Sequence, residues 1–127
     1  MSQPDVLCIG SATVDTFLTV DSSFSSIRLG DKVLVKAIEM HSGGGATNAA
    51  AALRKLGLNV NVLTKLGNDH HAEFVMKELN EYKVKNICRH HSRNHTDFAT
   101  IVSYTKDKDR TIYVHKGASQ DLEDCDF

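Results

Sequence analysis

Short apolar runs separated by polar turns open the chain and indicate β-structure. Val6 to Ile9 is a continuous apolar run that ends at a glycine and a serine, which is typical of a buried strand followed by a turn. Phe17 to Val20 and Lys32 to Met40 carry β-branched and alternating apolar residues, with the polar segment Asp21 to Asp31 between them. We expect these two segments to pair as strands across that loop.

Helical periodicity follows in two places. Thr47 to Leu56 is rich in alanine and begins at residues that can cap a helix, either Thr47 or Asn48. A second helix is predicted at about His70 to Lys83, where apolar residues recur on one face after Asp69, a suitable N-cap.

The remaining apolar segments predict further strands. Val60 to Leu63 is a second buried run, Ile87 to His90 is a short third one, and Phe98 to Tyr104 with Arg110 to His115 form a hairpin around a polar turn. Strands that alternate with helices favour parallel βαβ units, whereas hairpins favour antiparallel pairs. The pattern therefore predicts an α/β fold that combines a parallel sheet with antiparallel hairpins.

Composition narrows the classes of function. The 127 residues are enough for one domain, and 15 Lys and Arg against 16 Asp and Glu leave no basic excess that would attract nucleic acid. No signal peptide is visible, and no stretch approaches the roughly 18 apolar residues of a membrane span. Three distant cysteines (Cys8, Cys88 and Cys125) favour reduced thiols. We expect a cytoplasmic protein whose partners include neither nucleic acid nor membrane.

The glycine turn before the first predicted helix is the candidate binding site. Gly43, Gly44 and Gly45 allow the backbone to approach a ligand closely, and the start of a helix supplies free N–H donors. The side chain of Asn48 can both donate and accept, which suits sugar hydroxyls. Asp15 follows the first strand, and open α/β sheets bind ligands at the carboxyl ends of their strands. The alternative is a glycine turn with an asparagine cap and no ligand.

The seven histidines do not predict a metal site. His70 and His71 diverge by about 100° if helical, and His91 and His95 fall in a segment that we expect to be strand and loop. No GxxxxGK[ST] phosphate-binding loop occurs either.

These segments, in this order, resemble the ribokinase-like (PfkB) carbohydrate kinase family. The resemblance covers essentially the whole chain. The matching stretches are Ile9-Gly10 with Asp15, Gly43 to Ala50, Leu53 to Gly57, Lys65 to Asp69, Thr96, and Arg110 to Ile112 leading to Gly117 to Ser119. It implies a ribokinase-like fold, in which a partial Rossmann-type α/β sheet carries a small β-sheet lid formed from about residues 17–40 and 98–115.

The resemblance also implies an activity. Members use ATP and magnesium to phosphorylate a sugar hydroxyl; a nucleoside kinase of the same family and a non-catalytic half-kinase that binds a sugar or a partner are the alternatives. Asp15 would hydrogen-bond the hydroxyls of the sugar, and Gly43, Gly44 and Asn48 would line its site.

Two departures from the family pattern bear on substrate and activity. Gly45 stands where ribokinases proper usually carry a lysine, which weakens a ribose-specific assignment. Family members are much longer, and neither their catalytic Asp-x-x-Gly-Ala-Gly-Asp block nor their Asn-x-x-Glu magnesium motif occurs here. We expect an N-terminal, sugar-binding portion with its catalytic residues beyond Phe127, and no ATP or magnesium bound by this chain alone.

Association into a homo-oligomer, most simply a dimer, is a further expectation. A sheet interrupted at Phe127 would leave a strand edge unpaired. Apolar residues that alternate in the last hairpin would give the lid a second exposed surface, comprising Phe98, Thr100, Val102 and Tyr104, which Ile112 and Val114 could join.

Overall fold

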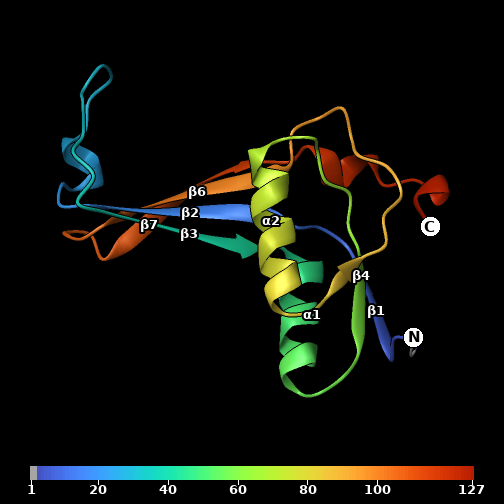
Figure 1. The fold of residues 1–127 in the computed structure, drawn as a ribbon. Helices are drawn as coiled ribbons and strands as arrows, with labels where there is room; N and C mark the ends of the chain where they lie inside the picture. The colour runs from blue at the N-terminus through green and yellow to red at the C-terminus, as the bar shows by residue number, and fades with distance from the viewer. Residues whose placement is uncertain (1–2) are drawn as a thin grey trace.

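The computed structural model describes residues 3–127, which form two separate β-sheets and two α-helices (Figure 1). The first sheet is parallel, with the strand order β1 (Val6–Ile9), β4 (Val60–Leu63) and β5 (Lys85–Asn86). The second sheet has the order β3 (Ala37–Gly43), β2 (Thr13–Val20), β6 (Asp97–Tyr104) and β7 (Asp109–His115). The fold is α/β and combines a parallel sheet with antiparallel pairs, as the sequence pattern predicted.

Helices α1 (Gly45–Lys55) and α2 (His70–Glu81) cover one face of the three-stranded sheet. The core lies between the sheet and the two helices, where Val60 and Val62 of β4 pack with Ala50 of α1 and Val75 of α2. Successive residues of a strand point to opposite faces, so the alternate residues of β1 leave this core. Leu7 and Ile9 accordingly remain 38% and 53% exposed.

The four-stranded sheet extends away from the helices, to the left in Figure 1. Its two central strands, β2 and β6, run parallel, and each pairs antiparallel with an outer strand, β2 with β3 and β6 with β7. Short 3-10 turns complete the described chain at η1 (Phe24–Ser26), η2 (Ala118–Asp121) and η3 (Asp124–Asp126).

Most of the predicted elements are present, and β1 and β4 have the predicted limits. The strand predicted at Lys32 to Met40 lies instead at Ala37–Gly43. Residues 21–36, between β2 and β3, leave the sheet and form a loop at its far end, which we call the tip loop. The strand predicted at Ile87 to His90 is wrong: β5 is the shorter segment Lys85–Asn86.

The start of α1 also differs from the prediction. Gly44 is its N-cap, and neither Thr47 nor Asn48 caps the helix. Thr47 is already helical, and its hydroxyl donates backwards to the carbonyl oxygen of Gly43. The cap predicted for α2 is confirmed, because a carboxylate oxygen of Asp69 accepts a 2.8 Å hydrogen bond from the N–H of Ala72.

The register of the last hairpin corrects one predicted surface. Residues directly opposite in an antiparallel pair share a face, and Ile112 lies opposite Ile101 while Val114 lies opposite Ala99. Ile112 and Val114 therefore do not join Phe98 and its alternate neighbours, but occupy the other face of the sheet.

Candidate functional site

Asp15 lies inside the four-stranded sheet rather than at the end of β1. It is the third residue of β2, beside His41 of β3 and Ala99 of β6. The hydroxyl of Thr13, two residues earlier on the same face, donates a 2.8 Å hydrogen bond to its Oδ1. One oxygen of this half-buried carboxylate is thus oriented by the protein.

Close packing requires the first two glycines of the turn, Gly43 against Asp15 and Gly44 against the backbone of Ser11. A Cβ at Gly43 would overlap Oδ2 of Asp15 and lie 2.9 Å from the Thr13 hydroxyl oxygen. Gly44 has φ +94°, and a Cβ there would overlap the carbonyl oxygen of Ser11. Asp15 and Gly43 therefore meet where β3 passes into α1, and Gly44 packs beside them on the backbone of Ser11 and Ala12, whereas a Cβ at Gly45 would have no neighbour within 4 Å.

Asn48 meets the glycine turn through its backbone. Because α1 begins at Gly45, Asn48 is the fourth helical residue, and its N–H donates a 3.0 Å hydrogen bond to the carbonyl oxygen of Gly44. Its exposed side chain lines a different cavity, of 210 Å³, whose wall includes Glu78, Glu81 and Tyr82 at α2. The earlier start of the helix removes the predicted capping role of Asn48, and its place in the sugar site stays a prediction.

A trough on the sheet surface adds residues that the sequence analysis did not identify. The trough has a volume of 390 Å³ and is lined by side chains of β2, β6 and β7: Asp15, Phe17, Ala99, Ile101, Ser103, Arg110 and Ile112. Their spacing of two along each strand was visible in the sequence, but the register that places the three strands side by side was not. Asp15 thus stands at one end of an elongated, largely apolar surface.

The matched segment Lys65 to Asp69 has a structural role within the described chain. The Asp69 carboxylate accepts hydrogen bonds from the N–H and hydroxyl of buried Thr96, each 2.8 Å, from Ala72 N at 2.8 Å and from His95 at 3.3 Å. Burial alone would raise the pKa of Asp69, but these hydrogen bonds outweigh it and lower the pKa to about 2. Asp69 thereby joins the start of α2 to the segment that leads into β6.

A buried ion pair holds the last residues against the parallel sheet. Lys65 Nζ lies 2.7 and 2.8 Å from the two carboxylate oxygens of Asp126, and these side chains are 7% and 0% exposed. The hydrogen bond from Lys65 keeps the pKa of Asp126 below its usual range, and the same hydrogen bond raises the pKa of Lys65.

Metal-ligating side chains do not cluster in residues 3–127, where no group of three or more His, Cys, Asp or Glu could hold an ion. Across the same residues, neither helix has the length and apolar character needed to cross a membrane.

The sequence of the chain matches a known protein family over the length that the structure describes. The model of the pfkB family carbohydrate kinases matches residues 3–127. Ribokinase of Bacillus subtilis (strain 168) is 28% identical over 120 residues, which make up 93% of this chain and 39% of that protein. The chain thus spans about two fifths of this relative.

Two solved structures confirm the ribokinase-like fold that the resemblance implied. Ribokinase from Cryptococcus neoformans var. grubii serotype A, in complex with ADP, has a TM-score of 0.72 at 25% identity and matches 88% of this chain and 34% of its own. Arabidopsis thaliana ribokinase complexed with ribose and ATP has a TM-score of 0.75 at 22% identity and matches 92% of this chain and 37% of its own.

Proposed function

Because the chain belongs to the pfkB family of carbohydrate kinases, we propose that it forms the sugar-binding half of a kinase that phosphorylates a sugar hydroxyl with ATP. The observation that carries this proposal is the carboxylate of Asp15, which Thr13 orients and Gly43 leaves uncovered. An ionised carboxylate only accepts hydrogen bonds, so it suits the hydroxyl donors of a sugar. Each such charged hydrogen bond contributes about 1.5–3 kcal/mol.

In this proposal ATP supplies the phosphoryl group and magnesium neutralises its charge. The residues described here do not form a ligand set for magnesium, so we assign no step to the metal on this chain. What the chain contributes is binding and orientation of the sugar that accepts the phosphoryl group. The cytoplasmic location stays a prediction.

We assign the four-stranded sheet to the small lid that the family resemblance implied. The sheet extends away from the helices (Figure 1). Asp15 is the third residue of β2 and lies beside Gly43 of the glycine turn. A ligand bound at Asp15 would lie against the face formed by Phe17, Ile101 and Ile112.

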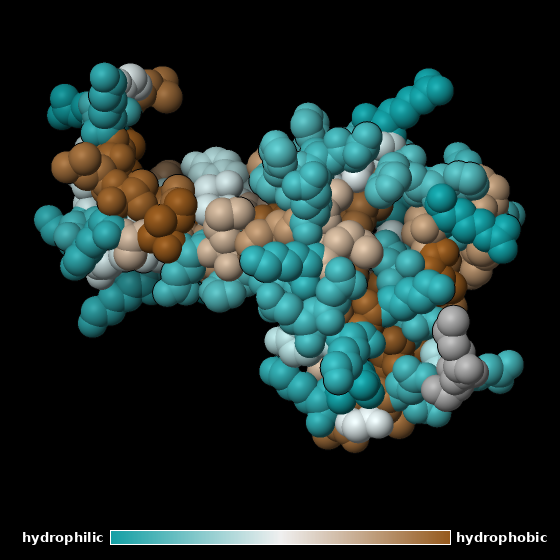
Figure 2. Space-filling view, viewed as in Figure 1, coloured by the Kyte–Doolittle hydropathy of each residue, from teal (hydrophilic) through white to brown (hydrophobic). Residues whose placement is uncertain are grey.

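The proposed homodimer would use the tip and the opposite face of this sheet. Ile38 and Met40 of β3 are 64% and 41% exposed and lie opposite Leu18 and Thr16, so they face away from Asp15. Figure 2 shows apolar side chains gathered at this end of the molecule. The exposed apolar residues of the tip loop are Phe24, Leu29, Leu34 and Val35.

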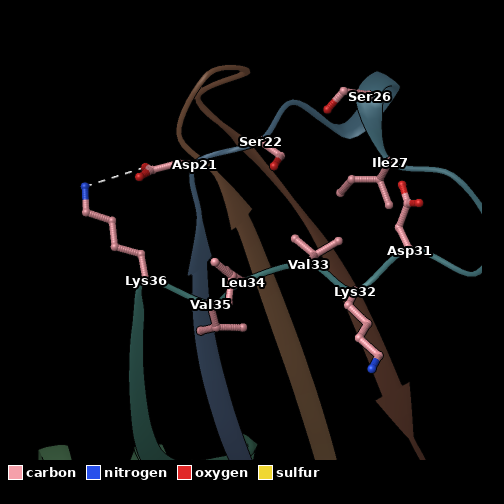
Figure 3. A pocket seen from close by; sticks show the side chains of 10 residues that line it. All are labelled: Asp21, Ser22, Ser26, Ile27, Asp31, Lys32, Val33, Leu34, Val35 and Lys36. Carbon is pink, nitrogen blue, oxygen red and sulfur yellow. Dashed lines mark ion pairs between the residues drawn. The ribbon is translucent and has the colours of Figure 1, made fainter.

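A hollow within the tip loop adds to the proposed dimer surface (Figure 3). It has a volume of 660 Å³ and is lined in part by Ile27, Val33 and Val35, with the ion pair of Asp21 and Lys36 at one end, 3.5 Å apart. An exposed apolar surface of this kind favours burial against a second copy. Because Ile38 and Met40 face away from Asp15, association there would leave the sugar site open.

The test is sugar binding by the chain as it stands. Titration with ribose, followed by NMR, should give saturable shifts that Asp15→Asn weakens by roughly tenfold or more, the loss of at least one charged hydrogen bond. Asp109→Asn, on exposed β7, is the matched control and should bind as the unchanged chain does. Equal affinity for Asp15→Asn and the unchanged chain would refute the proposed role. If the chain binds ribose but the full-length protein phosphorylates no sugar, the result favours the alternative of a non-catalytic, sugar-binding half-kinase.

A further inference from the structure

The strand that leads into the glycine turn is bonded to helix α2 through Glu78. We infer that Glu78 is a positioning residue for the sugar site: it touches no ligand, but fixes the end of β3, where Gly43 meets Asp15. The inference rests on the proposed function, because it takes Asp15 as the residue that binds the sugar hydroxyls. It adds a residue of α2 that controls the surroundings of this carboxylate.

Glu78 bonds twice to a single residue of β3, which ends beside α2 (Figure 1). Its Oε2 accepts a 3.1 Å hydrogen bond from the N–H of Ser42 and a second one from the Ser42 hydroxyl. β3 is the outer strand of its sheet, and among residues 3–127 its free edge pairs with no further strand. The carboxylate of Glu78 therefore accepts at Ser42 where a neighbouring strand would otherwise do so.

Ser42 and the next residue, Gly43, face opposite sides of the sheet. Ser42 lies opposite Val14, which is fully buried in the core. Gly43 lies opposite Thr13, whose hydroxyl bonds to Asp15 on the other face. Glu78 thus holds β3 from the core side, so any effect on the sugar site must pass through the backbone.

The backbone at Gly43 forms one wall of the Asp15 carboxylate. A Cβ at this position would overlap Oδ2 of Asp15, whereas Thr13 donates to Oδ1. Consecutive Cα atoms stay about 3.8 Å apart across a trans peptide, so a displacement of Ser42 also moves Gly43. Loss of Glu78 would therefore change the space around Oδ2, the oxygen that Thr13 does not bond.

The helical side of the glycine turn is held independently of Glu78. The hydroxyl of Thr47 donates to the carbonyl oxygen of Gly43, and this bond belongs to the first turn of α1. It fixes where the helix starts, but it does not reach Ser42 on the strand side. Removal of Glu78 should therefore loosen the end of β3 and leave the start of α1 in place.

The two hydrogen bonds need an acceptor oxygen at Glu78 rather than its charge. The same oxygen accepts from both donors of Ser42, and the amide oxygen of a glutamine can accept in the same way. Alanine removes the acceptor altogether. Comparison of Glu78→Gln with Glu78→Ala therefore separates the hydrogen bonds from the negative charge.

Titration of the chain with ribose, followed by NMR, tests the inference. We expect Glu78→Ala to weaken ribose binding by roughly fivefold and to shift the Gly43 amide signal, whereas Glu78→Gln should bind within about twofold of the unchanged chain. Glu73→Ala, an exposed carboxylate in the first turn of α2, is the matched control and should change neither. Val75→Ala controls for stability: it opens space in the core of the same helix, so it should lower the urea midpoint and leave ribose affinity unchanged.

The outcomes separate this inference from the proposed function. Unchanged ribose affinity in Glu78→Ala, with a loss in Asp15→Asn, would overturn the role of Glu78 alone. Equal losses in Glu78→Ala and Val75→Ala would also overturn it, because lower stability would then explain both. A loss in Glu78→Gln as large as that in Glu78→Ala would overturn the hydrogen bonds as the cause. Absence of saturable binding of millimolar ribose by the unchanged chain would overturn both proposals. Far-UV circular dichroism that matches the unchanged chain confirms that each variant is folded.

Discussion

Replacing Asp69 by asparagine should destabilise the chain in a pH-dependent way. The carboxylate of Asp69 accepts from Ala72, from both donors of Thr96 and from His95. An amide of the same shape keeps one acceptor oxygen and replaces the other by a donor, which would oppose the N–H of Thr96 and the ring of His95. Thr96 is fully buried, so its N–H could not turn to water instead.

The magnitude follows from the pKa of Asp69, which the hydrogen bonds lower from 3.8 to about 2 against the opposing effect of burial. Each pKa unit corresponds to about 1.4 kcal/mol, which gives an upper bound of about 2.5 kcal/mol. Solvent near the carboxylate screens part of this, so we expect about 1.5–2.5 kcal/mol. A lowered pKa stabilises the fold above the unfolded value, near 3.8, and this contribution is lost as the pH falls towards 2.

Urea unfolding followed by far-UV circular dichroism measures this contribution. The difference in free energy of unfolding between the unchanged chain and Asp69→Asn should have its full value at both pH 7 and pH 5. It should fall to about half of that value at pH 3. Asp124→Asn, an exposed carboxylate in η3, is the control and should show no such dependence. A difference that stays constant from pH 7 to pH 3 would refute the assignment to the ionised carboxylate.

Four further outcomes are expected. Gly44→Ala should lower the urea midpoint strongly, because its Cβ would meet backbone atoms at φ +94°, whereas Gly45→Ala should leave or raise it, because its Cβ meets nothing. Lys65→Met should destabilise more than the double change Lys65→Met with Asp126→Leu, since only the single variant leaves a buried charge unpaired; equal midpoints would contradict this. The chain alone should transfer no phosphoryl group from ATP in a coupled assay over pentoses, hexoses and nucleosides, and turnover that survives repurification would contradict this. Light scattering coupled to size exclusion should show a dimer at low micromolar concentration, and a 14.0 kDa monomer would exclude the proposed association.

The sequence predicted best those elements that depend on neighbouring residues. The apolar run of β1, the cap of α2 at Asp69 and the polar turn between β6 and β7 all follow from local pattern, and all are present. The start of α1 was misplaced because Gly44 caps it through its backbone alone, with no side-chain hydrogen bond to signal it.

The site was less predictable because a register between distant strands forms it. Nothing near Asp15 in the sequence indicates that Ala99 lies beside it, or that Ile112 shares its face rather than that of Phe98. The side chain of Asn48, which the sequence grouped with Asp15, lines a cavity at α2, and its role in sugar binding stays a prediction. A period of two identifies which residues of one strand share a face, whereas strand pairing decides which strands share it.

The parallel pairing of β2 with β6 also constrains the order in which the chain can fold. Each outer strand forms a local hairpin with its neighbour, but the two hairpins meet only when residues such as Asp21 and Thr105, 84 positions apart, come together. Closing so long a loop costs chain entropy before the new contacts compensate for it, so this junction should form slowly and late. During synthesis, Asp15 leaves the ribosome long before the strands that complete its trough. The ligand-binding surface should therefore be among the last parts of the chain to mature.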